Sequence, residues 1–210
     1  MALKAGIIGM PNVGKSTLFN AITKKNILAA NYPFATIDPN LGTVTVPDER
    51  LGVLERMYMP ERCIGAQYEF TDIAGLVKGA SSGEGLGNKF LSHIREVDAV
   101  IHVVRCFVDK DIIHVEGNID PIRDIEIINL ELAMSDLEIV SNRIDRIKKK
   151  AETSRDKEAL KEVELMEKCK SILSGGEVLR HHEFEEDELE ILKPFNLITM
   201  KSMIYLANVN

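Results

Sequence analysis

The amino-acid sequence predicts an α/β fold in which a mostly parallel sheet is flanked by helices. One observation predicts this sheet, and a second predicts an insertion in it. Short apolar or alternating stretches, typical of strands, take turns along the chain with stretches typical of helices. From about residue 123 to residue 176 the chain instead holds many helix formers and few turn residues, which indicates a helical hairpin inserted into the α/β domain.

Strands are expected where apolar residues cluster or alternate. Residues 3–8 lead into a glycine-rich turn, as a buried strand entering a loop does. Residues 99–105 form a β-branched run suited to a strand buried on both faces. A helix is expected at residues 16–22, and a shorter one follows Pro47 and Asp48. The expected strands are residues 3–8, 42–46, 68–72, 99–105 and 204–207.

The hairpin is predicted by the spacing of its apolar residues. In the first arm they recur alternately three and four residues apart, the heptad pattern of a coiled coil. Thr153 and Ser154 lie between the arms, and Gly175 and Gly176 end the second. We expect an antiparallel pair whose first arm is about 40 Å long. The apolar positions are Leu130, Ala133, Leu137, Val140, Ile144, Ile147 and Ala151, then Leu160, Val163, Met166, Cys169 and Leu173.

Composition excludes several classes of protein. The chain has 210 residues, 45% of them hydrophobic and 28% charged, as in ordinary globular proteins. A net charge of −7 argues against a globally basic nucleic-acid binder, and no sequence-specific DNA binding is expected. Apolar runs are too short to span a bilayer, and the N-terminus lacks a cleavable leader. Three cysteines without C-x-x-C pairing predict neither disulfides nor zinc, so we expect a cytoplasmic protein.

A phosphate-binding loop is predicted at residues 9–16, which match the pattern G-x-x-x-x-G-K-S/T between an expected strand and an expected helix. Glycines let backbone amides surround phosphate oxygens at a helix N-terminus, which favours anions. Lys15 is expected to reach the β- and γ-phosphates of a nucleoside triphosphate, and the Ser16 hydroxyl to bind Mg²⁺. The alternative is a glycine-rich turn that binds no nucleotide.

Asp72 and Gly75 form a D-x-x-G pattern at the end of an expected strand. Asp72 is expected to hold Mg²⁺ through water, and Gly75 to offer its amide to the γ-phosphate. The glycines that follow suggest a mobile switch ordered by the γ-phosphate; the alternative is a flexible surface loop. Thr36, between the first helix and second strand, is a candidate for completing the Mg²⁺ shell, with a plain turn threonine as the alternative.

These residues resemble a known family. Residues 12–20, 32–37 and 72–80 look like the Obg-related P-loop GTPases of the translation-factor class. Residues 83–91 and the helical insertion narrow the resemblance to the YchF (Obg-like ATPase) branch. The resemblance implies a G domain, phosphate binding by Gly14, Lys15 and Ser16, Mg²⁺ binding by Ser16 and Thr36, association with ribosomes, and a TGS domain after the G domain. The expected nucleotide-binding residues are Asn12, Val13, Gly14, Lys15, Ser16, Thr17, Gly75, Asn208 and Val209, and the expected metal ligands are Ser16, Thr36 and Asp72.

Base recognition is expected after the last strand, where GTPases carry N-K-x-D. Asn208 matches the first position, but Val209 stands where lysine reads guanine. The resemblance implies a glutamate at the fourth position and a preference for ATP, while GTP remains open. Because the sequence stops inside this pattern, we expect a fragment or a separately encoded second half.

Hydrolysis needs a residue that positions water, and Leu76 stands where many GTPases carry glutamine. His114, in the loop after the fourth strand, is the candidate catalytic residue, because imidazole can polarise water near neutral pH. The alternatives are that His114 is a surface loop residue, or that K⁺ held by Asn12 supplies the charge. His93 and His102 are expected to be structural, and His181 and His182, in an acidic loop, are not expected to bind metal.

Basic residues crowd the hairpin tip, where they could contact ribosomal RNA phosphates; the alternative is a solvated helix surface. The expected function is Mg²⁺-dependent hydrolysis of ATP by a ribosome-associated regulatory protein. The alternative is an RNA- or ribosome-docking module in which nucleotide only sets the conformation, and a small-molecule kinase fits poorly. We expect residues 1–122 to begin the G domain, 123–176 to form the hairpin and 177–210 to return to the G domain. The basic tip residues are Arg143, Arg146, Lys148, Lys149, Lys150, Arg155 and Lys157.

Overall fold

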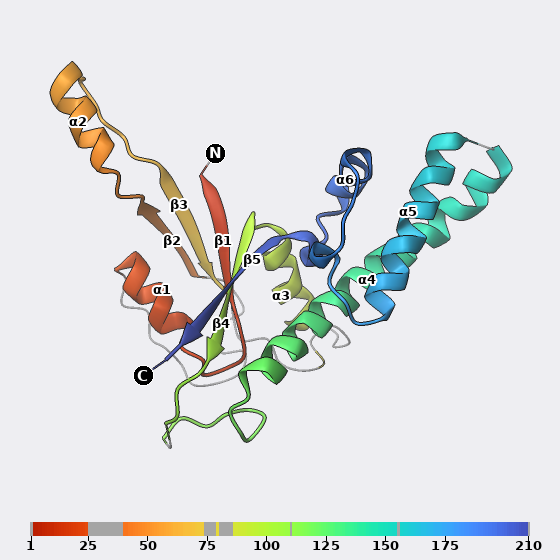
Figure 1. Cartoon of the computed structure of the whole chain (residues 1–210), viewed down its shortest axis with the longest axis horizontal. Helices are drawn as coiled ribbons and strands as arrows, with labels where there is room; N and C mark the ends of the chain where they lie inside the picture. The colour runs from red at the N-terminus through yellow and green to blue at the C-terminus, as the bar shows by residue number, and fades with distance from the viewer. Residues whose placement is uncertain are drawn as a thin grey trace.

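A mostly parallel sheet organises the molecule, as the sequence predicts (Figure 1). The computed structural model describes residues 2–24, 40–73, 79, 86–109, 111–154 and 156–209. Within them five strands run in the order β2-β3-β1-β4-β5. Only β2 is antiparallel to its neighbour, β3; the other pairs are parallel. The strands are β1 (Leu3–Ile8), β2 (Asn40–Thr45), β3 (Gln67–Asp72), β4 (Ala99–Arg105) and β5 (Ser202–Asn208).

The central strands are buried because helices cover the sheet. Ile7 and Ile8 of β1 and Val100 of β4 are fully buried, as parallel strands between helical layers require. Gly42 of β2 allows close packing of a helix, since a Cβ there would lie 2.3 Å from the Thr23 side chain. The flanking helices are α1 (Lys15–Thr23), α3 (Leu86–Arg95) and the first turns of α4 (Pro121–Ser154).

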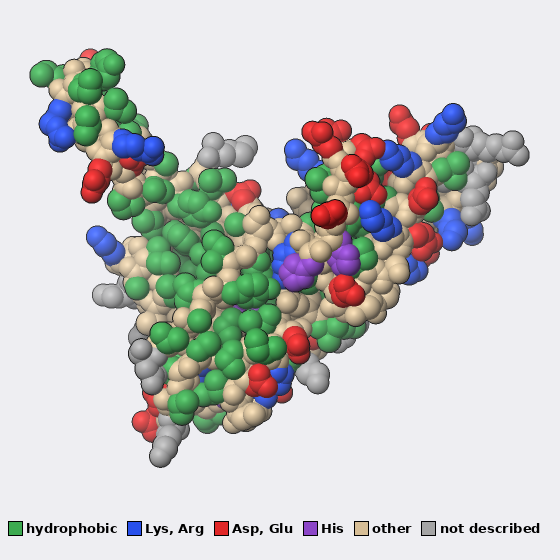
Figure 2. Space-filling model, in the orientation of Figure 1, with side chains coloured by type: hydrophobic (Ala, Val, Ile, Leu, Met, Phe, Trp, Pro, Cys, Tyr) green, Lys and Arg blue, Asp and Glu red, His purple; other side chains and the backbone are tan. Residues whose placement is uncertain are grey.

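Helix α2 (Glu49–Tyr58) stands apart from this core, at the far end of the β2–β3 ribbon (Figure 1). Asp48 caps it by accepting a hydrogen bond from the Arg50 amide at 3.0 Å. No residue of α2 is buried, and Met57 and Tyr58 are largely exposed. Hydrophobic side chains consequently show on this arm in Figure 2.

The long helix α4 and the helix α5 (Lys157–Ser174) form the predicted helical hairpin. Its 34 residues make α4 about 50 Å long, longer than expected, because it begins at Pro121 and its first turns pack on the sheet. Ile128 and Leu132 belong to the sheet core, whereas Val140 and Ile144 pack with α5. Helix α4 therefore belongs to both the core under the sheet and the core of the hairpin.

The segment between α5 and β5 differs from the expected acidic loop. Residues 186–192 form helix α6 (Glu186–Leu192), which begins in a capping box between Glu185 and Glu188. Three short 3₁₀ turns complete the return to the sheet: η1 (Leu179–His181), η2 (Lys193–Phe195) and η3 (Ile198–Met200). No helix in the described part of the chain is long and apolar enough to cross a membrane.

Candidate nucleotide-binding site

The phosphate-binding loop connects β1 to α1, as predicted, and its two glycines hold conformations that other residues rarely adopt. Gly9 has φ +150° and Gly14 has φ +99°. A Cβ on Gly9 would lie 2.4 Å from the Val103 carbonyl oxygen, so no side chain fits. The loop then enters α1 with the Leu18 amide donating to the Gly14 carbonyl at 2.9 Å. These constraints leave the loop amides at a helix N-terminus.

Lys15 folds back across this loop. Its ammonium donates a hydrogen bond to the Met10 carbonyl oxygen at 2.7 Å, and the side chain is buried. Burial lowers the pKa of Lys15 to about 8, partly opposed by the negative charge of Asp72. The positively charged Lys15 ammonium therefore lies against the loop whose backbone amides are expected to bind phosphate.

Asp72, at the carboxyl end of β3, accepts a hydrogen bond from the Ser16 hydroxyl at 2.9 Å. Burial raises the pKa of Asp72, against the opposing effects of the Ser16 hydrogen bond, the Lys15 charge and the Asn40 side-chain amide. Its second oxygen, Oδ1, is buried without a hydrogen-bond partner among the described residues. An unpaired buried carboxylate oxygen beside a hydroxyl is costly unless a cation completes it, and these oxygen donors suit Mg²⁺.

Two predicted site residues, Thr36 and Gly75, are not described, and neither is Leu76, which stands where many GTPases carry glutamine. Asp72 and Ser16 are therefore the predicted metal ligands whose positions the structure gives, and it brings them together.

The end of β5 lies against the phosphate-binding loop. The Asn208 side-chain amide donates to the Val13 carbonyl oxygen at 3.0 Å, and the Asn208 carbonyl accepts from the Cys106 amide at 2.8 Å. A Cβ on Gly14 would lie 2.5 Å from this Asn208 amide nitrogen. Val209, the next residue, is 66% exposed. Asn208 thus joins the base-recognition end of the predicted site to its phosphate end.

His114 is buried, so the alternative of a surface loop residue is wrong. Its Nδ1 accepts from the Glu116 amide at 3.2 Å, and its Nε2 lies 2.8 Å from a carboxylate oxygen of Asp124 in α4. Since Nδ1 accepts a hydrogen bond, Nε2 carries the proton of the neutral ring and donates a hydrogen bond to the Asp124 carboxylate. The preceding residue, Ile113, touches the phosphate-binding loop, because the Asn12 amide donates to its carbonyl oxygen at 3.2 Å. The loop lies beside the predicted site with the imidazole turned towards α4.

His102 and His182 have neighbours outside the predicted site. His102 lies within β4, is 1% exposed and packs 5.5 Å from the Tyr205 ring. His182 pairs with Glu177 at 2.9 Å.

The basic hairpin tip is partly neutralised by its own acids. Arg143 makes two hydrogen bonds to Glu162, at 2.6 and 3.0 Å, and Lys148 pairs with Glu167 at 3.2 Å. The side chain of Lys150 and the whole of Arg155 lie outside the described residues. The exposed Lys148–Glu167 pair contributes little to stability, and both pairs reduce the charge available to a phosphate.

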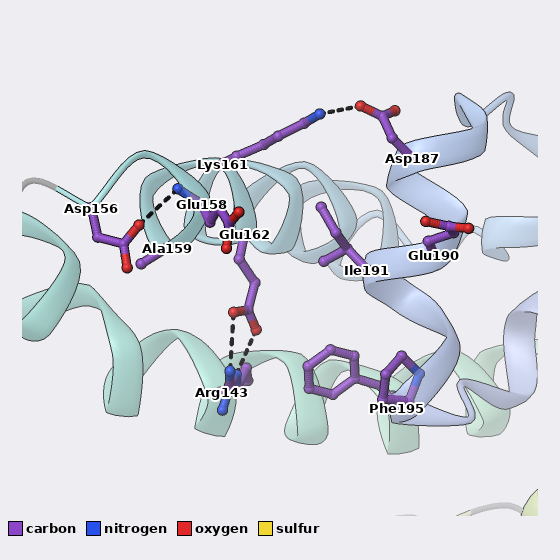
Figure 3. Close-up of a pocket in the computed structure, with 11 residues that line it drawn as sticks. Arg143, Asp156, Glu158, Ala159, Lys161, Glu162, Asp187, Glu190, Ile191 and Phe195 are labelled. Atoms are coloured by element: carbon purple, nitrogen blue, oxygen red, sulfur yellow. Dashed lines mark hydrogen bonds and ion pairs between the residues drawn. The ribbon is translucent and has the colours of Figure 1, made fainter.

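A groove of about 820 Å³ lies between α5, α6 and Arg143 (Figure 3). Lys161 pairs with Asp187 across its rim, while Ile191 and Phe195 supply apolar surface. The Arg143 guanidinium lies 5.5 Å from the Phe195 ring. Figure 2 shows acidic side chains gathered over α6 beside this groove. Its residues are separate from those of the phosphate-binding loop.

The sequence did not predict several of the contacts around the nucleotide-binding site. Arg105, Asp124 and the pairing of Asn12 with Ile113 were not expected to shape the site. The sequence does hold one signal for Arg105. It is the one charged residue in the run from Ala99 to Arg105, which is otherwise suited to a buried strand. The partners of Arg105 are backbone carbonyls, which leave no mark in the sequence.

The strand order, the phosphate-binding loop and the Ser16–Asp72 pair define a P-loop nucleotide-binding domain of the G-domain type. Residues 4–143 match the model of the 50S ribosome-binding GTPase family. The chain belongs to this family.

Several relatives are similar over essentially the whole chain, as the resemblance predicted. Ribosome-binding ATPase YchF of Bacillus subtilis is 55% identical over all 210 residues, which cover 57% of that protein. Obg-like ATPase 1 of Oryza sativa subsp. indica is 50% identical over 99% of the chain and 53% of its own length. The solved Schizosaccharomyces pombe YchF GTPase has 46% identity and a TM-score of 0.78, covering 99% of this chain and 57% of that one. The chain spans a little over half the length of these relatives.

Proposed function

We propose that the chain is the nucleotide-binding part of a Mg²⁺-dependent hydrolase that cleaves ATP to ADP and phosphate, with GTP the less favoured substrate. The observation that carries the proposal is the Ser16–Asp72 pair, 2.9 Å apart, whose other carboxylate oxygen is buried without a hydrogen-bond partner among the described residues. The similar Bacillus subtilis YchF and Oryza sativa Obg-like proteins are named ATPases, which supports ATP as the substrate. The similar Schizosaccharomyces pombe YchF is named a GTPase, so GTP stays in the test.

Each residue has a defined task in this proposal. The amides of residues 12–17 hold phosphate oxygens, and Lys15 exchanges the Met10 carbonyl for the β- and γ-phosphates. Ser16, Asp72 and Thr36 hold Mg²⁺, which neutralises the charge on the phosphates when bound. Gly75 donates its amide to the γ-phosphate, and Asn208 steadies Val13 behind the loop.

His114 remains the candidate for positioning the attacking water. Its Nε2 proton is held by Asp124, so the proposal requires the imidazole to exchange that carboxylate for water when the triphosphate binds. A K⁺ ion held beside Asn12 is a further candidate for supplying charge. The Asn12 side chain donates through its amide nitrogen to the Ile113 carbonyl oxygen at 3.2 Å, so K⁺ would have to bind the side-chain oxygen of Asn12 instead.

The proposed partner is the ribosome, in the cytoplasm, with the hairpin tip as the contact to RNA phosphates. Support comes from the names of the similar YchF proteins, which are called ribosome-binding. We propose the division into residues 1–122, 123–176 and 177–210 as a functional one, although the first turns of α4 pack in the sheet core and only its later turns pack with α5. The second candidate function, a ribosome-docking module in which nucleotide only sets the conformation, is favoured by the position of α4, whose first residues contact the His114 loop.

Turnover of ATP and GTP by the protein, with Mg²⁺ and in K⁺ buffer, tests the proposal. Lys15→Ala is the control, because it removes the buried cation over the loop. ATP turnover above this control, exceeding GTP turnover, supports the proposal, and turnover equal to the control leaves only the docking module. In the same assay His114→Ala is expected to slow turnover without weakening nucleotide affinity.

A further inference from the structure

Arg105 ends β4 with a fully buried guanidinium, 1% exposed, directly before the 106–118 loop. Its three nitrogens donate to three carbonyl oxygens of that loop: Nε to Phe107 at 3.3 Å, Nη2 to Asp109 at 3.2 Å and Nη1 to Ile112 at 3.1 Å. The guanidinium carbon also lies 4.5 Å from the Phe107 ring centroid. Within the described ranges, no carboxylate forms an ion pair with it.

This arrangement is costly as plain packing. A buried cation is tolerated only when its donors are satisfied, and here backbone carbonyls rather than a carboxylate satisfy them. The rigid planar fork of arginine fixes the directions of its donors, so carbonyls at three positions must turn towards one point. Arg105 therefore dictates the path of the loop around itself.

The far end of that path lies at the predicted site. Ile112, held by Arg105, precedes Ile113, whose carbonyl oxygen accepts from the Asn12 side chain in the phosphate-binding loop. His114 follows, with its imidazole between the Glu116 amide and Asp124. One chain of contacts thus runs from the Arg105 guanidinium to Asn12 and His114.

We propose that Arg105 is a positioning residue that holds the 106–118 loop in register with the phosphate-binding loop, and so sets where His114 and the Ile113 carbonyl stand relative to the γ-phosphate. The inference rests on the proposed function for its effect on hydrolysis. The Arg105 guanidinium bonds to carbonyls of the 106–118 loop, and it is the Arg105 backbone that pairs with Asn208 of β5. A change confined to the guanidinium is therefore expected to alter the geometry of the reaction and not nucleotide affinity.

Arg105→Lys is the direct test, because lysine keeps the charge but cannot reach three carbonyls in a plane. Displacing reacting groups by about 1 Å can cost on the order of 100-fold in rate. We expect single-turnover ATP hydrolysis to fall at least about tenfold while the dissociation constant for MgATP stays within about threefold. Arg180→Lys is the matched control, since its guanidinium also bonds neutral acceptors, Asn129 and Tyr205, away from the site.

A second measurement does not depend on hydrolysis. Hydrogen exchange of the Glu116 amide and of the His114 Nε2 proton, followed by NMR, reports whether the loop keeps its place. Both protons are expected to exchange faster in Arg105→Lys and unchanged in Arg180→Lys. Phe107→Leu, which removes only the ring stacked on the guanidinium, gives a smaller change in the same direction and serves if Arg105→Lys fails to fold.

Wild-type turnover equal to the Lys15→Ala control would remove the proposed function, and the exchange rates alone would then decide the role of Arg105. Unchanged exchange in Arg105→Lys overturns the inference whatever the turnover. Faster exchange with unaltered hydrolysis overturns it as well, because the loop position would then be irrelevant to the reaction.

Discussion

Asp72 has one carboxylate oxygen bonded to Ser16 and the other buried without a described partner. Burial raises the pKa of this carboxyl, so its negative charge costs the nucleotide-free protein stability. A group kept at such a cost is expected to have a use when the nucleotide binds. That use, in the proposed function, is to hold Mg²⁺.

Asp72→Asn separates the two effects. We expect the melting temperature without nucleotide to change little, because the lower cost of burying a neutral amide is offset by the loss of a negative charge near the buried Lys15 ammonium. Affinity for MgATP is expected to fall at least about tenfold, while affinity for ATP measured in excess chelator changes little. Calorimetric titration with and without Mg²⁺ gives both values. An equal loss of affinity with and without the metal would contradict the assignment of Asp72.

His102 predicts how stability depends on pH. Burial, followed by the positive charges of Arg180 and Lys15, lowers its pKa from 6.5 to about 4 in the folded protein. Between pH 6.5 and about pH 4, His102 is protonated in the unfolded chain but neutral in the folded chain, so lowering the pH favours unfolding. His102 does not affect the free energy of unfolding above about pH 6.5, and it lowers that free energy by about 3 kcal/mol once the pH falls through 4.

Denaturant unfolding at several pH values checks this expectation. His102→Phe, which keeps an aromatic ring beside Tyr205, should flatten the decline in unfolding free energy between neutral pH and about pH 4.5. The exposed His181 gives the control, and His181→Gln should keep the decline. If the two variants decline equally, His102 is not the residue responsible.

At the scale of elements, α4 fastens the hairpin to the surroundings of the site through three buried carboxylates. Asp124 holds His114, and Glu131 accepts a hydrogen bond from the Gly79 amide at 2.5 Å. Asp136 accepts four hydrogen bonds, from the Ile198 amide, the Thr199 amide and hydroxyl, and Arg95 of α3. These contacts bind α3, α4 and the segment before β5 into one unit.

Asp136→Ala tests how much that unit depends on its centre. The substitution removes the carboxylate partner of Arg95, which keeps its bonds to Ser135 and Asn196, and leaves two buried backbone amides without their acceptor. Breaking a buried pair of this kind typically costs about 3–5 kcal/mol of unfolding free energy. Glu138→Ala, at an exposed position of the same helix, should cost under about 0.5 kcal/mol. Urea unfolding measures both, and a loss below about 1 kcal/mol for Asp136→Ala would show that the network contributes little.

The sequence predicts some elements better than others, for physical reasons. The phosphate-binding loop is a contiguous motif whose geometry depends on Gly9 and Gly14, so it is predicted residue by residue. The hairpin is predicted from its apolar spacing, although Leu130 and Leu160 at its expected seam are 45% and 41% exposed. Their neighbours Ile128 and Leu165 are buried instead, because the first turns of α4 face the sheet and α5 meets α6.

Other features depend on contacts between distant residues. The acidic residues after His182 predict a loop, whereas a capping box between Glu185 and Glu188 and the burial of Leu192 make residues 186–192 helical. Placing His114 required knowing that its partner, Asp124, lies in the first turn of α4. No periodicity in the sequence carries that information.

At the scale of the whole molecule, two projections extend from the sheet: the α2 arm and the hairpin (Figure 1). The hairpin tip is the one proposed to meet RNA. Charge reversal of Lys148, Lys149 and Lys150 is expected to reduce co-sedimentation with ribosomes and to flatten its dependence on salt, because fewer counterions are released. Reversing Arg50, Arg56 and Arg62 on the α2 arm makes an equal change of charge elsewhere and should have no such effect. Binding that survives the lysine reversal would exclude the tip as the contact.

The central claim is that residues 9–16 and Asp72 bind a nucleoside triphosphate together with Mg²⁺. Titration of the protein with ATP and with GTP, each with and without Mg²⁺, tests it most directly when Lys15→Ala is titrated beside the wild type. The account predicts that MgATP binds more tightly than MgGTP, that chelating the metal weakens binding, and that Lys15→Ala abolishes it. Equal binding by wild type and Lys15→Ala, or no binding by either, would contradict the account.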